Sequence, residues 1–493
     1  MTVSPARRDA FDILVRVERD GAWASELLNA PRMERLSRED RALCHELVMS
    51  TLRWQSTLDT RIAKYSSKKI DRLDVEVRTA LRLAACQLFR LDRIPAHSAV
   101  HESVELVKSA GKRSAAPFVN AVLRKLALQQ PELGVAGDPE GKAQAAAVTK
   151  DRAAGAEDAR VLGAEFAHPE WMVARWIGRY GSFAARAICA ADQKPPATAL
   201  RLPPQPVQLR ACLGLPREAR EAGGFAEIED ELKAEGIRLA PGALLAGARR
   251  LLSGNLARSA AFHERRLAVQ DEASQLVAAL VGRGARILDC CAAPGGKTSA
   301  IAARNPGAAI VAVELHEHRA RALKERLGAL PVQVITGDAA AMEWAEKFDC
   351  VLADVPCSGT GTLAAHPEIK WRLRPEDLGR LKDLQVSILR AAAGALAPGG
   401  RLVYSTCSLE AEEGEEVVDQ VLRGQVLHGQ ILRGFGALHV VDCKSVLQHL
   451  HDSGELIWSE PESLLRGPYL RTLPGIHPCD GFFAAVLRRD MED

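Results

Sequence analysis

The stretch ILDCCAAPGGKT, residues 287–298, decides the fold of the second half of this chain. It begins with an apolar run typical of a buried strand, and the glycines that follow predict a tight turn into a helix. Glycine leaves the backbone N–H groups at the start of such a helix open to a ligand. The stretch therefore predicts a ligand-binding loop between a strand and a helix, with Gly295 and Gly296 at its centre.

Four more short apolar runs follow this loop, with helical stretches between most of them. They are AAIVAVEL (308–315), PVQVITGDA (331–339), FDCVLADVP (348–356) and GGRLVYSTC (399–407). Alternating strands and helices at this spacing predict a doubly wound, mostly parallel sheet. We place this α/β Rossmann-like domain at residues 262–493 and expect its ligands beyond the carboxyl ends of the strands.

Two classes of cofactor use a glycine-rich turn of this kind. A Walker A loop requires glycine at position 291, but the chain has Cys291 there and Pro294 inside the loop. The pattern therefore argues against an NTPase and favours an adenosyl cofactor.

Acidic residues follow the next three strands of the predicted sheet. Glu314 ends the second strand, 18 residues after Gly296, and can accept hydrogen bonds from both hydroxyls of a ribose. Asp338 ends the third strand, where it can hold an adenine edge, and Asp354 ends the fourth. Each acid alone is more often a turn former or a helix cap, but the combination favours an adenosyl cofactor.

Two cysteines also follow strands at this edge, Cys357 in DVPCSGTG and Cys407 in YSTCSLE. A thiolate is strongly nucleophilic, and its addition to carbon-6 of cytosine gives an enamine that accepts a methyl group at carbon-5. This chemistry does not rank the two cysteines. The cysteines that we interpret as buried small hydrophobic residues are Cys44, Cys86, Cys189, Cys212, Cys290, Cys350, Cys443 and Cys479.

Residues 1–130 have a helical pattern throughout. Apolar residues recur at the helical period in RALCHELVMSTLRW (41–54) and in VRTALRLAACQLFRL (77–91). Ser37, followed three residues later by Asp40, predicts the start of a capped helix. These patterns predict an all-α bundle.

Charge is unevenly distributed, although the whole chain carries a net charge of only +2. Residues 1–130 hold 23 Lys and Arg against 16 Asp and Glu, whereas the remainder holds 42 against 47. The basic first part suggests that it helps to hold a polyanion, since phosphate neutralisation dominates sequence-independent binding to nucleic acids. Solvated basic helix faces would give the same charge.

The middle of the chain predicts a linker and a small connector. Residues 131–160 are rich in Ala, Gly and charge, which predicts a flexible linker. For residues 161–261 we expect a small α/β subdomain. It begins with a helix that carries Trp171 and Trp176, and its stretch KPPATALRLPP can form only an edge strand or an extended segment.

Composition excludes several classes of protein. With 493 residues, 47% of them hydrophobic, the chain is long enough for two or three folded domains. The cysteines show no CxxC pair and no zinc-ligand spacing, so we expect reduced thiols and no metal. No signal core or long apolar run appears, so we expect a cytoplasmic protein without a membrane partner. We also expect a monomer, although the residues do not determine the oligomeric state.

Five motifs resemble those of the RNA cytosine-5 methyltransferase family: CAAPGGKT, DVPCSGTG, HPEIKW, STCS and the terminal DGFFAAVLRR. The helical part resembles the RNA-binding fold of the antitermination factor NusB. The resemblance covers almost the whole chain and extends to the bacterial members that act on small-subunit ribosomal RNA. It implies S-adenosyl-L-methionine as the cofactor, a cytosine of 16S ribosomal RNA as the substrate, and extrusion of that cytosine into the pocket.

The resemblance also implies roles for individual residues. Cys407 is the implied nucleophile and Cys357 assists release of the covalent adduct, while Asp354 also steadies the flipped cytosine. The residues implied to contact the cofactor are Cys291, Ala292, Ala293, Pro294, Gly295, Gly296, Lys297, Glu314, Asp338 and Asp354.

Several positions remain open. Lys297 is placed near the cofactor carboxylate or RNA, or else faces solvent. Lys370 and Trp371 in HPEIKW are expected to line the substrate cleft, as a cation and a stacking face. Glu314 stands where the family pattern has Asp, and residues 422–436 have no functional interpretation.

Two alternatives to this function are transfer RNA as the substrate and a non-catalytic RNA-binding module with a degenerate second half. The intact motif residues argue against the module: Gly295, Gly296, Asp354, Cys357 and Cys407.

Overall fold

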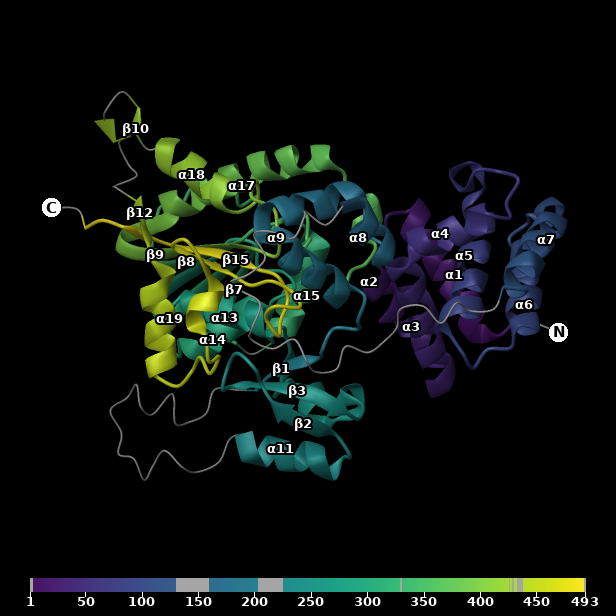
Figure 1. The fold of residues 1–493 in the computed structure, drawn as a ribbon. Helices are drawn as coiled ribbons and strands as arrows, with labels where there is room; N and C mark the ends of the chain where they lie inside the picture. Colours follow the sequence, from purple (N-terminus) through teal and green to yellow (C-terminus); the bar gives the residue numbers. More distant parts are fainter. Residues whose placement is uncertain are drawn as a thin grey trace. The chain divides into compact units, whose positions relative to one another are not determined.

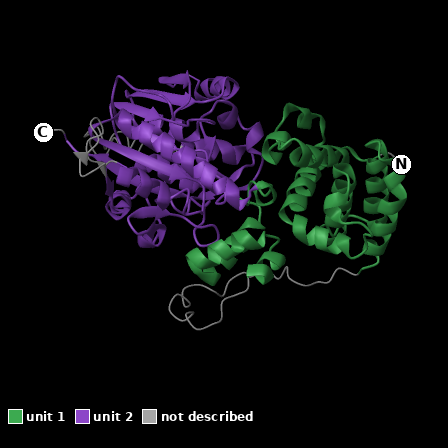
Figure 2. Cartoon of the chain, turned by 90° about the horizontal axis from the view of Figure 1, so that it is seen from above, with its two compact units in different colours: residues 1–195, 363–372 green, residues 196–362, 373–493 purple. Residues whose placement is uncertain are grey.

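The computed structural model describes residues 3–129, 159–202, 225–328, 330–424, 426–427, 430–431 and 438–491. The chain forms two compact units (Figure 2). Unit 1 comprises Met1–Pro195 and Leu363–Arg372, and unit 2 comprises Pro196–Thr362 and Leu373–Asp493. A short segment from the second half of the chain therefore folds with the first half.

The N-terminal part of unit 1 is helical, as predicted (Figure 1). Leu47 and Leu81, from the two expected apolar stripes, are fully buried. The Asp40 N–H donates to Ser37 Oγ at 3.0 Å and so caps α3. The helices here are α1 (Pro5–Arg19), α2 (Ala24–Leu28), α3 (Arg38–Arg53), α4 (Gln55–Ala63), α5 (Val75–Arg90), α6 (Ala96–Ser109) and α7 (Ala116–Ala127).

Three more helices belong to unit 1: α8 (Ala159–Glu165), α9 (Glu170–Asp192) and α16 (Ile369–Arg372). Helix α8 packs against both α4 and α9. The expected connector, 161–261, is therefore divided, because its helices fold with unit 1 and its strands with unit 2. The expected linker, 131–160, lies outside the described residues except for its last two positions.

Unit 2 begins with a small antiparallel sheet in the order β2-β3-β1-β4. Its strands are β1 (Ala199–Arg201), β2 (Arg238–Pro241), β3 (Ala248–Ser253) and β4 (Ala268–Val269). Strand β1 pairs on both sides, so the prediction of an edge strand or extended segment in KPPATALRLPP is wrong. The prolines of that stretch flank the three paired residues, each of which keeps its N–H for the ladder.

The larger sheet contains all five strands predicted from the sequence, as parallel neighbours in the order β9-β8-β5-β6-β7. They are β5 (Arg286–Asp289), β6 (Ala309–Glu314), β7 (Val332–Thr336), β8 (Phe348–Asp354) and β9 (Leu396–Thr406). Beyond β9 follow the antiparallel strands β15 (Phe483–Arg489), β14 (Tyr469–Arg471), β13 (Leu465–Arg466) and β12 (Leu438–Val441). The predicted doubly wound, mostly parallel fold is confirmed.

Apolar side chains cover both faces of this sheet, because successive strand residues point to opposite sides. Ile287 and Leu352 belong to one core, and their neighbours Leu288 and Val351 belong to the other. The helices around the sheet are α13 (Glu272–Leu280), α14 (Gly296–Arg304), α15 (Glu317–Leu327), α17 (Pro375–Ala395), α18 (Glu415–Gly424) and α19 (Cys443–Asp452). Since the strands are parallel, their carboxyl ends meet at one edge.

Two further observations concern the described residues. None of their helices is long and apolar enough to cross a membrane. The stretch 422–436 lies largely outside them, apart from the end of α18 and the paired strands β10 (Val426–Leu427) and β11 (Gln430–Ile431).

Candidate active site

The glycine-rich loop joins β5 to α14 in unit 2, as predicted. Cys291, Ala292, Ala293 and Pro294 form the turn, and α14 begins at Gly296. Gly295 has a φ of 98°, a conformation that side chains rarely adopt, and a Cβ there would lie 2.7 Å from Leu323 Cδ1. Glycine at 295 is therefore required by both the backbone conformation and the space.

Asp289, at the end of β5, is a site residue that the sequence reasoning missed. Its side chain is buried, and Thr298 Oγ1 donates to its Oδ2 at 2.7 Å. Burial raises the pKa of Asp289 to about 6, against the Thr298 hydrogen bond, which lowers it. Its Oδ1 has no hydrogen-bond partner within the described residues and is free to accept one from a ligand. Its position beside the glycine loop was the available signal.

Glu314 and Asp338 lie at the carboxyl ends of β6 and β7, as expected. Glu314 is buried, and its Oε1 accepts from the His316 N–H at 3.0 Å. Asp338 Oδ1 accepts from the Ala340 N–H at 2.9 Å. Both acids thus make the local turn contact that the sequence left open, and each keeps its second carboxylate oxygen for other partners.

Lys297 forms an ion pair with Asp354 instead of facing solvent. The Nζ atom lies 2.8 Å from Asp354 Oδ2 and 4.8 Å from the centre of the Phe482 ring, and the side chain is 14% exposed. Burial lowers the pKa of Lys297, but the Asp354 carboxylate raises it more, so the pKa lies above its ordinary value. Ser405 Oγ donates to the other Asp354 oxygen at 2.7 Å. The ion pair fixes both side chains beside the glycine loop.

The structure brings Cys357 and Cys407 together. They follow the neighbouring strands β8 and β9, and their sulfur atoms lie 3.2 Å apart. Both are free thiols and partly exposed. The hydrogen bond with Cys407 and then burial raise the pKa of Cys357 well above its ordinary value. Cys357 therefore keeps its proton at neutral pH.

The remaining cysteines behave largely as expected. Those buried in the structure are Cys44, Cys86, Cys189, Cys290, Cys350 and Cys443. Cys479 is only partly buried, and Cys212 lies outside the described residues.

Lys370 and Trp371 do not line a substrate cleft, so this prediction is wrong. Lys370 is 1% exposed, and its Nζ donates to Arg53 O at 2.8 Å and to Ala167 O at 2.9 Å. Trp371 Nε1 donates to Leu52 O at 2.7 Å. These polar groups are used within unit 1, where they satisfy backbone carbonyls at the end of α3 and before α9.

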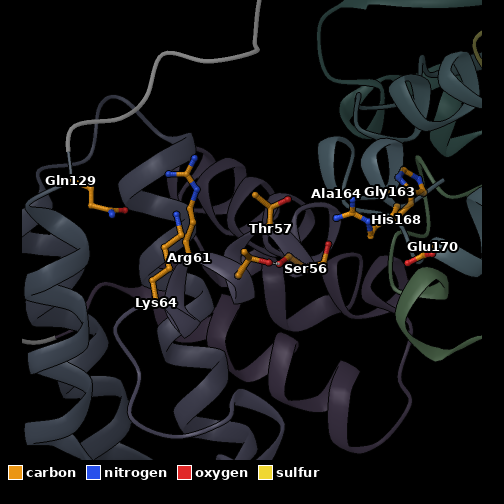
Figure 3. A pocket seen from close by; sticks show the side chains of 11 residues that line it. Ser56, Thr57, Arg61, Lys64, Gln129, Gly163, Ala164, His168 and Glu170 are labelled. Carbon is orange, nitrogen blue, oxygen red and sulfur yellow. Dashed lines mark hydrogen bonds between the residues drawn. The ribbon is translucent and has the colours of Figure 1, made fainter. Parts of the chain in front are cut away.

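Unit 1 also contains a cavity of about 610 Å³, shown in Figure 3. Arg61 and Lys64 line it, and neither pairs with a carboxylate among the described residues. Thr57 Oγ1 in its wall is buried without a hydrogen-bond partner in the same set of residues. Glu170 is the acidic residue in the lining. The cavity therefore offers unpaired cations and hydroxyl groups to an anionic ligand.

These observations define a class of protein. A glycine loop, acids at three strand ends and two adjacent thiols lie on a doubly wound sheet, and the same chain carries a NusB-like helical unit. That combination is an α/β methyltransferase fused to a helical domain. The chain belongs to the 16S rRNA methyltransferase RsmB/F family, whose model matches residues 280–488, and the NusB family model matches residues 4–128.

Curated relatives and a solved structure resemble the chain over most of its length. The "Probable ribosomal RNA small subunit methyltransferase B" of Bacillus subtilis is 34% identical over 85% of this chain and 88% of that protein. A putative methyltransferase of Mycobacterium tuberculosis is 31% identical over 99% of this chain and 97% of that protein. The crystal structure of PH0851, 21% identical, covers 99% of this chain and 100% of that chain with a TM-score of 0.72, a likeness of fold.

The chain is therefore an rRNA methyltransferase that uses S-adenosyl-L-methionine. The site fits that cofactor. Gly295 leaves space that a Cβ would fill, and Asp289 presents a buried carboxylate oxygen without a partner in the described residues. Glu314 is placed to accept hydrogen bonds from ribose hydroxyls, as in other nucleotide-binding folds.

Proposed function

We propose that this chain methylates carbon-5 of a cytosine in small-subunit ribosomal RNA, with Cys407 as the nucleophile. The observation that supports this most directly is the pair of thiols, 3.2 Å apart, at the same sheet edge as the glycine loop. One thiolate is needed to activate the pyrimidine, and a second acid–base group is needed to release it. Two cysteines on neighbouring strand ends supply both.

The reaction begins when the target cytosine leaves its stack and enters the pocket. The Cys407 thiolate forms a bond to carbon-6, and the electron pair of the 5,6 double bond moves toward carbon-5. S-adenosyl-L-methionine supplies the methyl group that carbon-5 accepts. Loss of the carbon-5 proton to a base then restores the double bond and expels Cys407. Cys357 assists this release, since its protonated thiol can donate to the departing sulfur.

Asp354 steadies the polar edge of the cytosine and also contacts the cofactor. Its carboxylate is held by Lys297 and Ser405, so its orientation is set before substrate arrives. Lys297 is used in this ion pair and is not available as an independent cation. The cofactor contacts that we propose come from residues 291–297, Glu314, Asp338 and Asp354.

For RNA binding, we assign part of the contact to the cavity in unit 1. Arg61 and Lys64 place two cations without carboxylate partners among the described residues, and the hydroxyls of Ser56 and Thr60 lie in the same lining. Cations and hydroxyls of this kind hold phosphate and sugar oxygens. The protein acts, in this proposal, as a monomer in the cytoplasm.

Transfer of labelled methyl groups to unmodified RNA tests the proposed substrate. Purified protein is incubated with radiolabelled S-adenosyl-L-methionine and either small-subunit RNA or transfer RNA from cells that lack it. We expect label in small-subunit RNA, released on digestion as 5-methylcytosine. Label confined to transfer RNA would assign the other substrate, and label in a different nucleoside would overturn the carbon-5 chemistry.

A further inference from the structure

We propose that Glu413 is a positioning residue that sets the spacing of Cys357 and Cys407 by holding the residue that follows each cysteine. This inference rests on the roles proposed above for the two thiols. The sequence gives no sign of such a role, because Glu413 lies in the acidic run EAEEGEE, a pattern typical of a solvated helix start.

The Glu413 side chain is fully buried and surrounded by donors. Its Oε1 accepts from the Ser358 N–H at 2.8 Å and from Gln385 Nε2 at 2.9 Å. Its Oε2 accepts from the hydroxyls of Ser358 and Ser408. A buried carboxylate is tolerated only with such partners, and hydrogen bonds to it are short and strong.

The donors explain why this carboxylate matters to the chemistry. Ser358 directly follows Cys357, and Ser408 directly follows Cys407. One carboxylate oxygen therefore binds hydroxyls from both cysteine loops, which are otherwise 50 residues apart in the chain. The sulfur–sulfur distance of 3.2 Å is a consequence of where these two loops are held.

The position of Glu413 is itself fixed. Its carbonyl oxygen accepts from Tyr404 OH at 2.7 Å, and Tyr404 is fully buried in β9. Arg471 donates to Ser408 O at 2.6 Å, which holds the second cysteine loop from its other side. A Cβ on Gly414 would lie 2.9 Å from Arg471 Nη2, so the next residue must be small. The carboxylate is thus anchored to the sheet rather than to a surface loop.

Glu413 acts through these loops and not on the substrate. Both of its oxygens are occupied by donors from the protein, and none of the side chain is exposed. Its charge adds to the rise in the pKa of Cys357, after the contributions of Cys407 and of burial. It therefore supports the protonated state of Cys357 as well as its place.

The test uses Glu413→Gln in the full-length protein, because glutamine keeps the size but loses the charge and one acceptor. We expect kcat for methyl transfer to fall on the order of 100-fold, as for a displaced reacting group. KM values for cofactor and RNA stay within about twofold, because ground-state binding is not touched. The matched control is Glu416→Gln, an exposed acid of the same run that pairs with Lys382, and it keeps wild-type kcat.

A second readout measures the spacing of the thiols without any RNA. Phenylarsine oxide bridges two adjacent thiols, and Cys357→Ser identifies the tight binding that depends on this pair. We expect Glu413→Gln to bind the arsenical at least about tenfold more weakly, because two-point attachment is lost when the sulfurs separate. Unchanged arsenical affinity, or an unchanged kcat, would overturn the proposal.

If Glu413→Gln does not fold, Ser358→Ala and Ser408→Ala each remove one hydroxyl donor and leave the carboxylate in place. Both are expected to weaken arsenical binding and lower kcat, by roughly tenfold for one lost hydrogen bond to a charged group. Wild-type affinity and kcat in both would refute the role of Glu413. A wild-type protein that bound the arsenical tightly but methylated no RNA would refute the proposed function and leave this inference standing.

Discussion

Cys357 and Cys407 are chemically the same residue, and the structure separates them by environment. Their sulfurs are 3.2 Å apart, and the pKa of Cys357 is raised by its hydrogen bond with Cys407 and by burial. A protonated Cys357 is suited to donate to a neighbouring sulfur, while Cys407 follows β9 beside it. The reasoning from thiol chemistry alone did not rank the two, because the motifs place both after a strand and say nothing of their contact.

Removal of each cysteine is expected to give a different product. Cys407→Ala abolishes methyl transfer, since no bond to carbon-6 forms. Cys357→Ala instead leaves a protein–RNA adduct that survives a denaturing gel, because release is impaired. The double variant forms no adduct, which controls for non-specific cross-linking. An adduct in Cys407→Ala and none in Cys357→Ala would reverse the roles.

Asp289 makes the stability of the protein depend on pH. Its pKa of about 6 lies above the ordinary 3.8, so between these values the folded chain holds a proton that the unfolded chain has lost. The free energy of unfolding therefore falls as pH rises from about 4 to about 6, and this loss is complete above pH 6.

Asp289→Asn removes this dependence. At pH 7.5 we expect the free energy of unfolding of the variant to exceed that of the wild type by up to about 3 kcal/mol, following the size of the shift. At pH 4 the two are expected to be equal. Urea denaturation at both pH values measures the difference, and an equal gap at both would contradict the burial of this charge.

At the scale of elements, the loop between β5 and α14 depends on one backbone conformation. Gly295→Ala places a Cβ 2.7 Å from Leu323 Cδ1 at a φ of 98°. We expect cofactor affinity to fall at least about tenfold, as the loop shifts to relieve strain of roughly 1–3 kcal/mol. Isothermal titration with S-adenosyl-L-methionine measures this.

The matched control is Gly307→Ala. Gly307 has a similar φ of 85°, but a Cβ there meets nothing within 4 Å, and the residue lies outside the glycine loop. We expect a comparable loss of stability from the backbone and an unchanged cofactor affinity. Equal loss of affinity in both variants would show that global destabilisation, and not the loop, is responsible.

Elements with a strong periodic pattern were predictable from the sequence, and elements decided by distant partners were not. The five parallel strands and the helices of residues 1–130 followed from the apolar period. Strand β1 was misjudged because prolines near it suggested an edge, although none lies within the paired residues. Lys370 was misjudged because a lysine in a polar motif gives no sign that two backbone carbonyls will bury it.

The candidate site was predictable to the same degree. Motifs at strand ends identified Glu314, Asp338, Asp354 and both cysteines, since parallel strands bring their ends together. Asp289 and Glu413 were missed, because their importance comes from burial and from donors far along the chain. A sequence pattern records neither of these.

At the scale of the whole molecule, the uneven charge of the sequence corresponds to a basic cavity in unit 1. Arg61→Gln with Lys64→Gln is expected to weaken RNA binding roughly tenfold at 0.1 M salt and to reduce the salt dependence by up to one unit per lost phosphate contact. Filter binding across a salt series measures both.

The control pair is Lys68→Gln with Lys69→Gln, which removes the same charge from exposed residues outside the cavity lining. We expect it to change RNA affinity much less. Equal effects from both pairs would show that total charge, and not the cavity, holds the RNA.

The segment Leu363–Arg372 has a consequence for how the protein is made. It belongs to unit 1, yet it is encoded far beyond the rest of that unit, and Lys370 and Trp371 supply buried contacts there. A nascent chain that has emerged only as far as residue 195 cannot complete its first folding unit. Translation must pass residue 372, through much of the catalytic half, before that unit closes. The RNA-holding part and the methyl-transferring part are therefore bound to mature together, and a gene cut between them would deliver neither whole.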